Sequence, residues 1–167
     1  VKKQFFDLLP KDAFSLVNKD DKNAKFMQQN TVSKKVSYAI NNYADFNLKI
    51  LESNFSGMLL NIDNNEIWTN LLGDFNASNL LAVYAVSVLT GNEKIEILKK
   101  ISLLKNVPGR FQTFKSDYES YVIIDYAHTP KALESIIQSI NQIRTHNEKL
   151  ITVIGCGGER DIEKRFE

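Results

Sequence analysis

The sequence lacks paired cysteines, an excess of either charge and any long apolar run, and each absence excludes a class of protein. The single cysteine rules out an internal disulfide, which fits a reducing cytosol. Lys and Arg number 21 against 20 Asp and Glu, so the basic excess of a nucleic-acid-binding protein is missing. No apolar run approaches the roughly 20 residues of a membrane-spanning helix, and no signal peptide opens the chain. We expect a cytoplasmic protein, taken to be a monomer, with no nucleic-acid partner and no membrane insertion.

The length and the hydrophobic content allow a substantial core. A chain of 167 residues, 43% of them hydrophobic, can hold one domain or parts of two. Val1 begins within a helical pattern without an initiator methionine, and Glu167 stops without a closing element. We therefore expect a fragment of a longer protein, with some site residues outside it.

Residues 121–131, Tyr-Val-Ile-Ile-Asp-Tyr-Ala-His-Thr-Pro-Lys, are the most informative stretch. The apolar run at its start predicts a strand buried on both faces. Thr129 and Pro130 predict a helix start, with the hydroxyl as N-cap and the proline at the first helical position. Apolar residues at spacings of three and four then predict a helix up to residue 143. A second strand, residues 150–154, would complete a strand–helix–strand unit, so the fold class is α/β.

Open parallel sheets bind ligands at the carboxyl ends of their strands, and polar residues stand at both predicted ends. Asp125 could accept hydrogen bonds from ribose hydroxyls or serve only as a turn residue. His128 could bond a ligand or support the turn before the helix. The glycine loop 155–158 could offer N–H groups to an anion, although it lacks the spacing of a P-loop or a dinucleotide fingerprint. Its Cys156 is interpreted as a small residue that fits rather than as a nucleophile.

Two arginines and an acidic pair also have two readings each. Arg160 could clamp a carboxylate with both arms of its guanidinium, or pair with a neighbouring acid on the surface. Arg110, after a Pro-Gly turn, could meet a phosphate or lie exposed. Asp20 and Asp21 could bind a cation or cap a helix.

The first hundred residues predict a strand-rich region followed by two helices. Asn76 and Asn79 lie three apart in the first turn of the first long helix, which is apolar almost all round and therefore predicted to be buried up to Gly91. These asparagines could bind a ligand, or form an N-cap and a solvated first turn. The second helix spans residues 93–104, and a domain boundary is placed near 108. Upstream we expect helices at 2–9 and 25–29, strands at 13–17, 36–40, 45–52, 57–62 and 66–71, and a turn at Asp63-Asn64-Asn65.

In combination these motifs resemble the Mur ligases of peptidoglycan assembly, and among them the enzymes that form UDP-N-acetylmuramyl tripeptide. The resemblance covers the whole chain, with the motifs in the family's order and spacing. Its most diagnostic parts are Asp-Tyr-Ala-His-Thr-Pro and Gly-Cys-Gly-Gly. The others are Asn-Lys-Asp-Asp at 18–21, Gln-Asn-Thr at 29–31, Leu-Gly-Asp-Phe-Asn-Ala-Ser-Asn at 72–79 and Val-Pro-Gly-Arg-Phe at 107–111.

The resemblance implies a two-part chain and an ATP-dependent, amide-forming ligase. Residues 1–107 would be the C-terminal part of the central ATP-binding domain, and 108–167 the start of a Rossmann-like C-terminal domain. In such ligases a carboxylate of UDP-N-acetylmuramoyl-L-alanyl-D-glutamate takes the γ-phosphoryl group of ATP, and the amine of meso-diaminopimelate or L-lysine attacks the acyl phosphate. Magnesium and arginines can stabilise the charge that develops.

The family's site residues are carried over by position. The resemblance implies that Asn76 and Asn79 lie by the nucleotide, that Arg110 meets its phosphates or ribose, and that Asp125 holds the ribose. His128 is included with the ATP-binding residues. Arg160 would bind the carboxylate of the incoming diamino acid. Lys2 aligns with the lysine that is carbamylated to bridge toward magnesium.

The chain also departs from the family pattern. It contains no P-loop, which we expect before Val1, and it has Lys164-Arg165-Phe166 where the family usually has Lys-Arg-Pro. The motif that separates diaminopimelate enzymes from lysine enzymes is expected after Glu167, so the diamino acid is left open. Two alternatives stand beside this interpretation: a folylpolyglutamate synthetase-like ligase and a nucleotide-binding module without catalysis.

Overall fold

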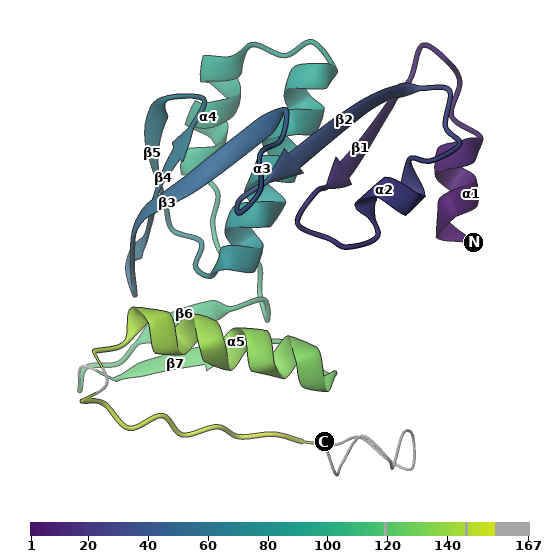
Figure 1. Cartoon of the computed structure of the whole chain (residues 1–167). Coiled ribbons are helices and arrows are strands. Elements are labelled where there is room, and N and C mark those ends of the chain that lie inside the picture. The colour runs from purple at the N-terminus through teal and green to yellow at the C-terminus, as the bar shows by residue number, and fades with distance from the viewer. Residues whose placement is uncertain (119, 146, 156–167) are drawn as a thin grey trace.

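A five-stranded mixed sheet forms the first part of the computed structural model, which describes residues 1–118, 120–145 and 147–155 (Figure 1). The strand order is β1-β2-β3-β4-β5, with β1, β2 and β3 parallel and the last two antiparallel to their neighbours. The predicted strands are confirmed with small shifts at their ends. Their bounds are β1 Phe14–Asn18, β2 Lys34–Ala39, β3 Phe46–Asn54, β4 Gly57–Ile62 and β5 Asn65–Thr69.

The turn between β4 and β5 follows from its two residues. Asp63 and Asn64 have φ values of 50° and 62°, as a type I′ hairpin requires at both central positions. Aspartate and asparagine tolerate this left-handed conformation better than most residues. The predicted turn is confirmed.

Two helices, α3 Asp74–Leu89 and α4 Lys94–Ser102, pack on one face of the sheet (Figure 1). The side of α3 with Leu81 and Tyr84 is fully buried against the strands. The prediction that α3 is buried all round is wrong, because Val83 and Val86, on its other side, are each about half exposed at 51% and 50%. The short helices α1 Lys2–Asp7 and α2 Ala24–Met27 pack against each other beside β1.

The second part contains a hairpin and one helix: β6 Gln112–Lys115, β7 Tyr121–Ile124 and α5 Pro130–Ile143. The predicted start of α5 is confirmed, since the Thr129 side chain accepts a hydrogen bond from the Ala132 N–H at 3.3 Å and Pro130 occupies the first turn. Phe111 and Ile140 belong to the same hydrophobic core as the five-stranded sheet. The expected boundary near 108 falls in the loop between α4 and β6.

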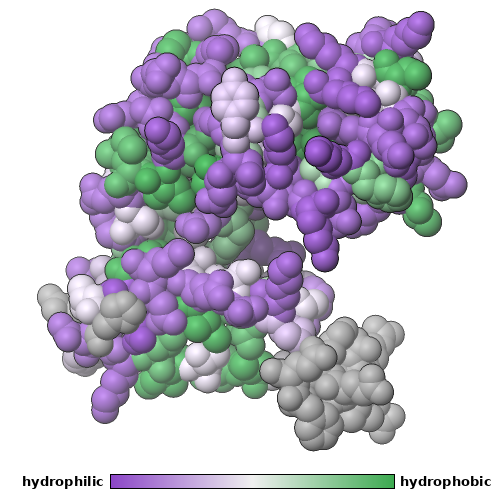
Figure 2. Space-filling model, viewed as in Figure 1, coloured by the Kyte–Doolittle hydropathy of each residue, from purple (hydrophilic) through white to green (hydrophobic). Residues whose placement is uncertain are grey.

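Three predictions for this part are wrong: the parallel sheet, the second strand and the burial of the first strand on both faces. β7 pairs antiparallel with β6, and residues 150–154 form no strand. Paired strands lie about 4.8 Å apart, whereas β7 and residues 148–155 line a cavity of about 680 Å³. Nor is β7 buried on both faces: Val122 and Ile124 are about half exposed, and Figure 2 shows apolar surface on this part of the molecule. The reason is that Ile123 faces the cavity beside α5, whereas Val122 and Ile124, which alternate with it, point to the other face of the strand.

The helices of the described part include none with the length and apolarity that a membrane crossing demands.

Candidate functional site

The first turn of α3 is open to solvent on one side. Its N-cap is Gly73, with φ of 88° and no side-chain cap, so the interpretation of Asn76 as the N-cap is wrong. Asn76 instead donates from Nδ2 to the carbonyl oxygen of Leu72 at 2.8 Å, and Asn79 is exposed one turn further on. A Cβ at Gly73 would lie 2.8 Å from the ring of Phe75, so both the backbone angle and the close approach require glycine.

The carboxyl end of β1 lies beside this turn. The Nδ2 of Asn18 is 3.5 Å from the Ser78 hydroxyl on α3, which joins the Asn-Lys-Asp-Asp motif to the helix. Asp20 accepts hydrogen bonds from the backbone N–H groups of Ile40, at 2.8 Å, and of Asn41. Burial alone would raise the pKa of Asp20, but these bonds and one from the Asn42 side chain outweigh it and lower the pKa.

The acidic pair of this motif has a structural role in the described part of the chain. Asp20 fixes the loop after β2, and the Oδ1 of Asp21 accepts from the N–H of Asn23, the N-cap of α2. Among residues 1–118, 120–145 and 147–155, no three His, Cys, Asp or Glu side chains lie close enough together to hold a metal ion. Asp21 thus fixes the turn before α2 and does not itself cap the helix, so its helix-cap reading is wrong, and the cation reading gains no support.

The loops before β6 and after β7 meet at the same end of the hairpin. Asp125 accepts two backbone hydrogen bonds there, from Phe111 N–H at 2.8 Å and from Ala127 N–H at 2.6 Å. The guanidinium of Arg110 lies over the ring of Tyr126, 4.7 Å from its centroid. Arg110 and Asp125 thus stand in two loops that meet at one end of the hairpin.

Phe111 connects these loops to α3. It is a non-glycine residue with φ of 47°, its side chain is fully buried, and its ring meets that of Phe75 edge-on at 5.6 Å. Phe75 precedes Asn76 in the first turn of α3, so the asparagines and the Arg110–Asp125 pair belong to one packed region. Sequence reasoning missed Phe111 and Tyr126, and their only signal was an aromatic residue next to each predicted site residue.

A carboxylate offers about four lone-pair positions, and the backbone uses one on each oxygen of Asp125. The turn reading of Asp125 therefore holds, and capacity remains for hydroxyl donors. The exposed His128 is 3.1 Å, through Nδ1, from the carbonyl oxygen of Tyr126, and its ring meets the tyrosine edge-on at 5.2 Å. This contact supports the turn, as one of its two readings predicts.

Neither of the other two site residues can be added to this region from the described part of the chain. Lys2 is exposed at the start of α1, whose recorded packing partner is α2. Arg160, with residues 156–158 of the glycine loop, lies outside the described residues.

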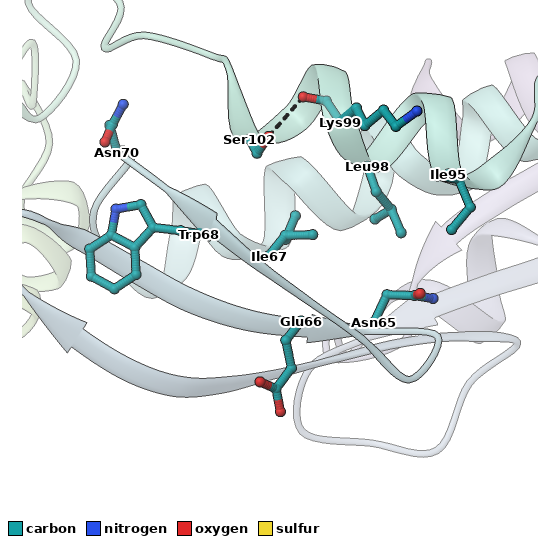
Figure 3. Close-up of a pocket in the computed structure, with 9 residues that line it drawn as sticks. All are labelled: Asn65, Glu66, Ile67, Trp68, Asn70, Ile95, Leu98, Lys99 and Ser102. Carbon is teal, nitrogen blue, oxygen red and sulfur yellow. Dashed lines mark hydrogen bonds between the residues drawn. The ribbon is translucent and has the colours of Figure 1, made fainter.

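Two hollows lined by described residues can be compared with these positions. The cavity between β7, α5 and residues 148–155 has Asp125 in its wall. The other, of about 580 Å³, lies between β5 and α4, where Ile67 and Leu98 face each other and Trp68 lies at one end (Figure 3). None of the predicted site residues lines this second hollow.

Both parts of the chain match domains of known protein families. Residues 1–87 match the Mur ligase middle domain, and residues 109–167 match the Mur ligase, glutamate ligase domain. UDP-N-acetylmuramoyl-L-alanyl-D-glutamate–2,6-diaminopimelate ligases of Bacteroides fragilis and Phocaeicola vulgatus are 46% and 48% identical to the chain over 164 residues. These matches cover 98% of this chain but 34% of each relative, so the chain spans about a third of their length.

Solved structures show the same fold. A structure of a UDP-N-acetylmuramoyl-L-alanyl-D-glutamate–2,6-diaminopimelate ligase is similar with a TM-score of 0.64 and 29% identity, over 91% of this chain and 33% of that one. MurF from Acinetobacter baumannii has a TM-score of 0.76 at 15% identity, over 86% of this chain and 32% of that one. Folylpolyglutamate synthase from Thermotoga maritima has a TM-score of 0.64 at 18% identity, over 81% of this chain and 33% of that one. At such identities the last two show the fold alone. Because the middle-domain match takes in 87 of the 167 residues, the chain belongs to the Mur ligase family.

Proposed function

We propose that this chain is part of an ATP-dependent ligase that joins 2,6-diaminopimelate to UDP-N-acetylmuramoyl-L-alanyl-D-glutamate. The observation that carries the proposal is the identity of 46% to 48%, over 98% of the chain, to relatives with that name. The names of these relatives also favour diaminopimelate over L-lysine, which the sequence alone left open. The cytoplasmic location and the monomeric state remain predictions.

The proposed reaction has two steps. A carboxylate oxygen of the dipeptide attacks the γ-phosphorus of ATP, forming an acyl phosphate as the bond to the β-phosphate oxygen breaks and ADP leaves. The diaminopimelate amine then attacks the acyl carbon, forming the amide, and inorganic phosphate departs as the amine loses a proton. Both steps concentrate negative charge on phosphoryl oxygens, where cationic side chains contribute most.

In this proposal the described residues serve nucleotide binding. Arg110 would contact phosphate oxygens with the in-plane N–H groups of its guanidinium. Asp125, fixed by two backbone hydrogen bonds, would accept from the ribose hydroxyls with its remaining lone pairs. Asn76 and Asn79 would lie beside the nucleoside. With its Nδ2 bonded to the Leu72 carbonyl, Asn76 would keep its carbonyl oxygen for the ligand, while exposed Asn79 offers its whole amide.

Arg160 would hold the carboxylate of diaminopimelate, and His128 would act mainly through Tyr126. Magnesium would neutralise phosphate charge when bound. Among the described residues no three His, Cys, Asp or Glu side chains cluster, and a carbamylated Lys2 would supply one part of the ligand set. We also propose a domain boundary near residue 108, supported by the two matched domains, which end at 87 and begin at 109.

The test is a substrate-dependence assay on the full-length protein encoded by the gene. ADP should form only when ATP, UDP-N-acetylmuramoyl-L-alanyl-D-glutamate and 2,6-diaminopimelate are all present, and mass spectrometry should find the tripeptide product. Turnover with L-lysine at equal efficiency would contradict the choice of diamino acid. Turnover with a reduced folate and glutamate would favour the folylpolyglutamate alternative, and ATP binding without turnover would favour the non-catalytic module.

A further inference from the structure

The guanidinium of Arg110 lies over an aromatic ring and has no charged partner among the described residues. The 4.7 Å separation from the Tyr126 centroid is a cation–π contact. A guanidinium carries five N–H donors. Among the described residues Arg110 makes no salt bridge, and its side chain donates no hydrogen bond. The contact therefore orients a side chain whose N–H groups are not taken up by any acceptor in the described part of the chain.

The backbone on both sides of this contact is fixed. Arg110 and Tyr126 each lie two residues beyond the last pair of the hairpin, Gln112 with Ile124. Phe111 holds a left-handed φ of 47°, a conformation that costs a non-glycine residue free energy and persists only where the surroundings impose it. Asp125 imposes it by accepting from the Phe111 N–H. Arg110 is thereby turned toward Tyr126.

Tyr126 is itself braced although its side chain is largely exposed, at 63%. The ring of His128 meets it edge-on at 5.2 Å, and the His128 Nδ1 is 3.1 Å from the Tyr126 carbonyl oxygen. The Tyr126 ring thus contacts both the His128 ring and the Arg110 guanidinium. Such an arrangement suits a platform for the arginine.

We propose that Tyr126 is a positioning residue for Arg110: it holds the guanidinium ready for a phosphate group of ATP. The proposal rests on the proposed function for the identity of the anion. A free arginine side chain loses rotamer freedom when it binds, and ordering it beforehand removes part of that cost. Tyr126 contacts no substrate in this scheme and acts through Arg110 alone.

The test is a double-mutant cycle in the full-length ligase, with the KM for ATP as readout. Tyr126→Leu removes the aromatic face and keeps apolar bulk, and it should raise the KM about two- to five-fold, the range for an exposed cation–π contact. Tyr126→Phe keeps the ring and should restore the KM. In an Arg110→Ala background, Tyr126→Leu should have no further effect. Tyr118→Leu, at the 90%-exposed tyrosine of the opposite hairpin end, is the matched control and should change nothing.

Additive effects of Tyr126→Leu and Arg110→Ala would overturn the proposal, because they would show that Tyr126 acts without Arg110. A defect in Tyr126→Phe equal to that in Tyr126→Leu would overturn it as well, since the ring face would then be irrelevant.

A second readout separates this proposal from the proposed function. In full-length protein labelled with ¹⁵N-arginine, the Arg110 Nε–H resonance, assigned by its loss in Arg110→Lys, should show a ring-current shift. The shift should persist in Tyr126→Phe and vanish in Tyr126→Leu, and addition of ATP should move the resonance saturably in the wild type. These results would support the platform even if no ligase turnover were found. An Arg110 resonance that is insensitive to Tyr126→Leu, or to ATP, would overturn it.

Discussion

Replacing Asp125 with alanine should loosen the two loops that carry the candidate nucleotide site. The carboxylate accepts from Phe111 N–H at 2.8 Å and Ala127 N–H at 2.6 Å. Hydrogen bonds to a charged group contribute about 1.5–3 kcal/mol each, and water can replace part of this at a half-buried site. Release of Phe111 from its left-handed conformation returns about 1–2 kcal/mol. We expect the free energy of local opening to fall by about 1–3 kcal/mol, which raises the equilibrium constant for opening roughly five- to hundred-fold.

Hydrogen exchange at the Phe111 and Ala127 amides measures this loss directly. Protection at both should fall by about that factor in Asp125→Ala, while amides of β4 keep theirs. In the full-length enzyme, the KM for ATP should also rise at least about tenfold. Asp117→Ala, at an exposed aspartate in the turn of the same hairpin, is the matched control.

The two readouts divide the possible roles of the carboxylate. Unchanged protection at both amides, with a raised KM for ATP, would refute the role of Asp125 in holding the two loops and leave it as a ligand of the nucleotide only. Lost protection with an unchanged KM would refute the ribose contact and leave a turn residue.

Four further outcomes are expected. Burial alone would raise the pKa of Asp63, but hydrogen bonds from Lys94 and the buried Tyr84 lower it. The stabilisation that Asp63 contributes is therefore complete above the unfolded pKa near 3.8 and is lost as the pH falls through the lower folded pKa. Asp63→Asn should flatten the fall in unfolding free energy at acid pH, measured by urea denaturation at a series of pH values. Gly73→Ala should destabilise the fold by about 1–3 kcal/mol in the same denaturation assay, because its backbone is left-handed and Phe75 is too close; an unchanged midpoint would refute this. Arg160→Lys should raise the KM for the diamino acid about ten- to hundred-fold and leave that for ATP nearly unchanged, since lysine lacks the two-armed geometry; equal rises would mean that Arg160 only supports its loop. The 167-residue chain alone should bind ATP weakly by calorimetry, because its sequence contains no P-loop, and micromolar binding would contradict this.

Local chemistry made several elements predictable. Thr129 and Pro130 mark the start of α5 because a hydroxyl cap and a proline in the first turn act within four residues. The turn at Asp63 and Asn64 is equally local, since these residues tolerate the positive φ that a tight hairpin needs. Neither requires knowledge of distant neighbours.

The errors arose where a segment's state depends on its neighbours. An apolar run such as Tyr121–Ile124 indicates a strand, but not which strands flank it or what covers its faces. The same limit explains α3: its apolar residues all round were taken to mean burial, whereas Val83 and Val86 lie half exposed on the side away from the strands. Composition predicts a preference for burial, and the packing partner decides whether it is met.

The candidate site shows the same division between intrinsic and acquired roles. Arg110 and Asp125 could be singled out because a guanidinium and a carboxylate carry their binding chemistry wherever they stand. Phe111 and Tyr126 could not, because a phenylalanine gives no signal that its φ will be positive, and a tyrosine none that an arginine will lie on its ring. Their contribution comes from where they lie. Phe111 packs the loop against Phe75 of α3, and Tyr126 contacts the guanidinium of Arg110. A substitution at either aromatic residue should therefore alter the geometry of a charge that it does not itself carry.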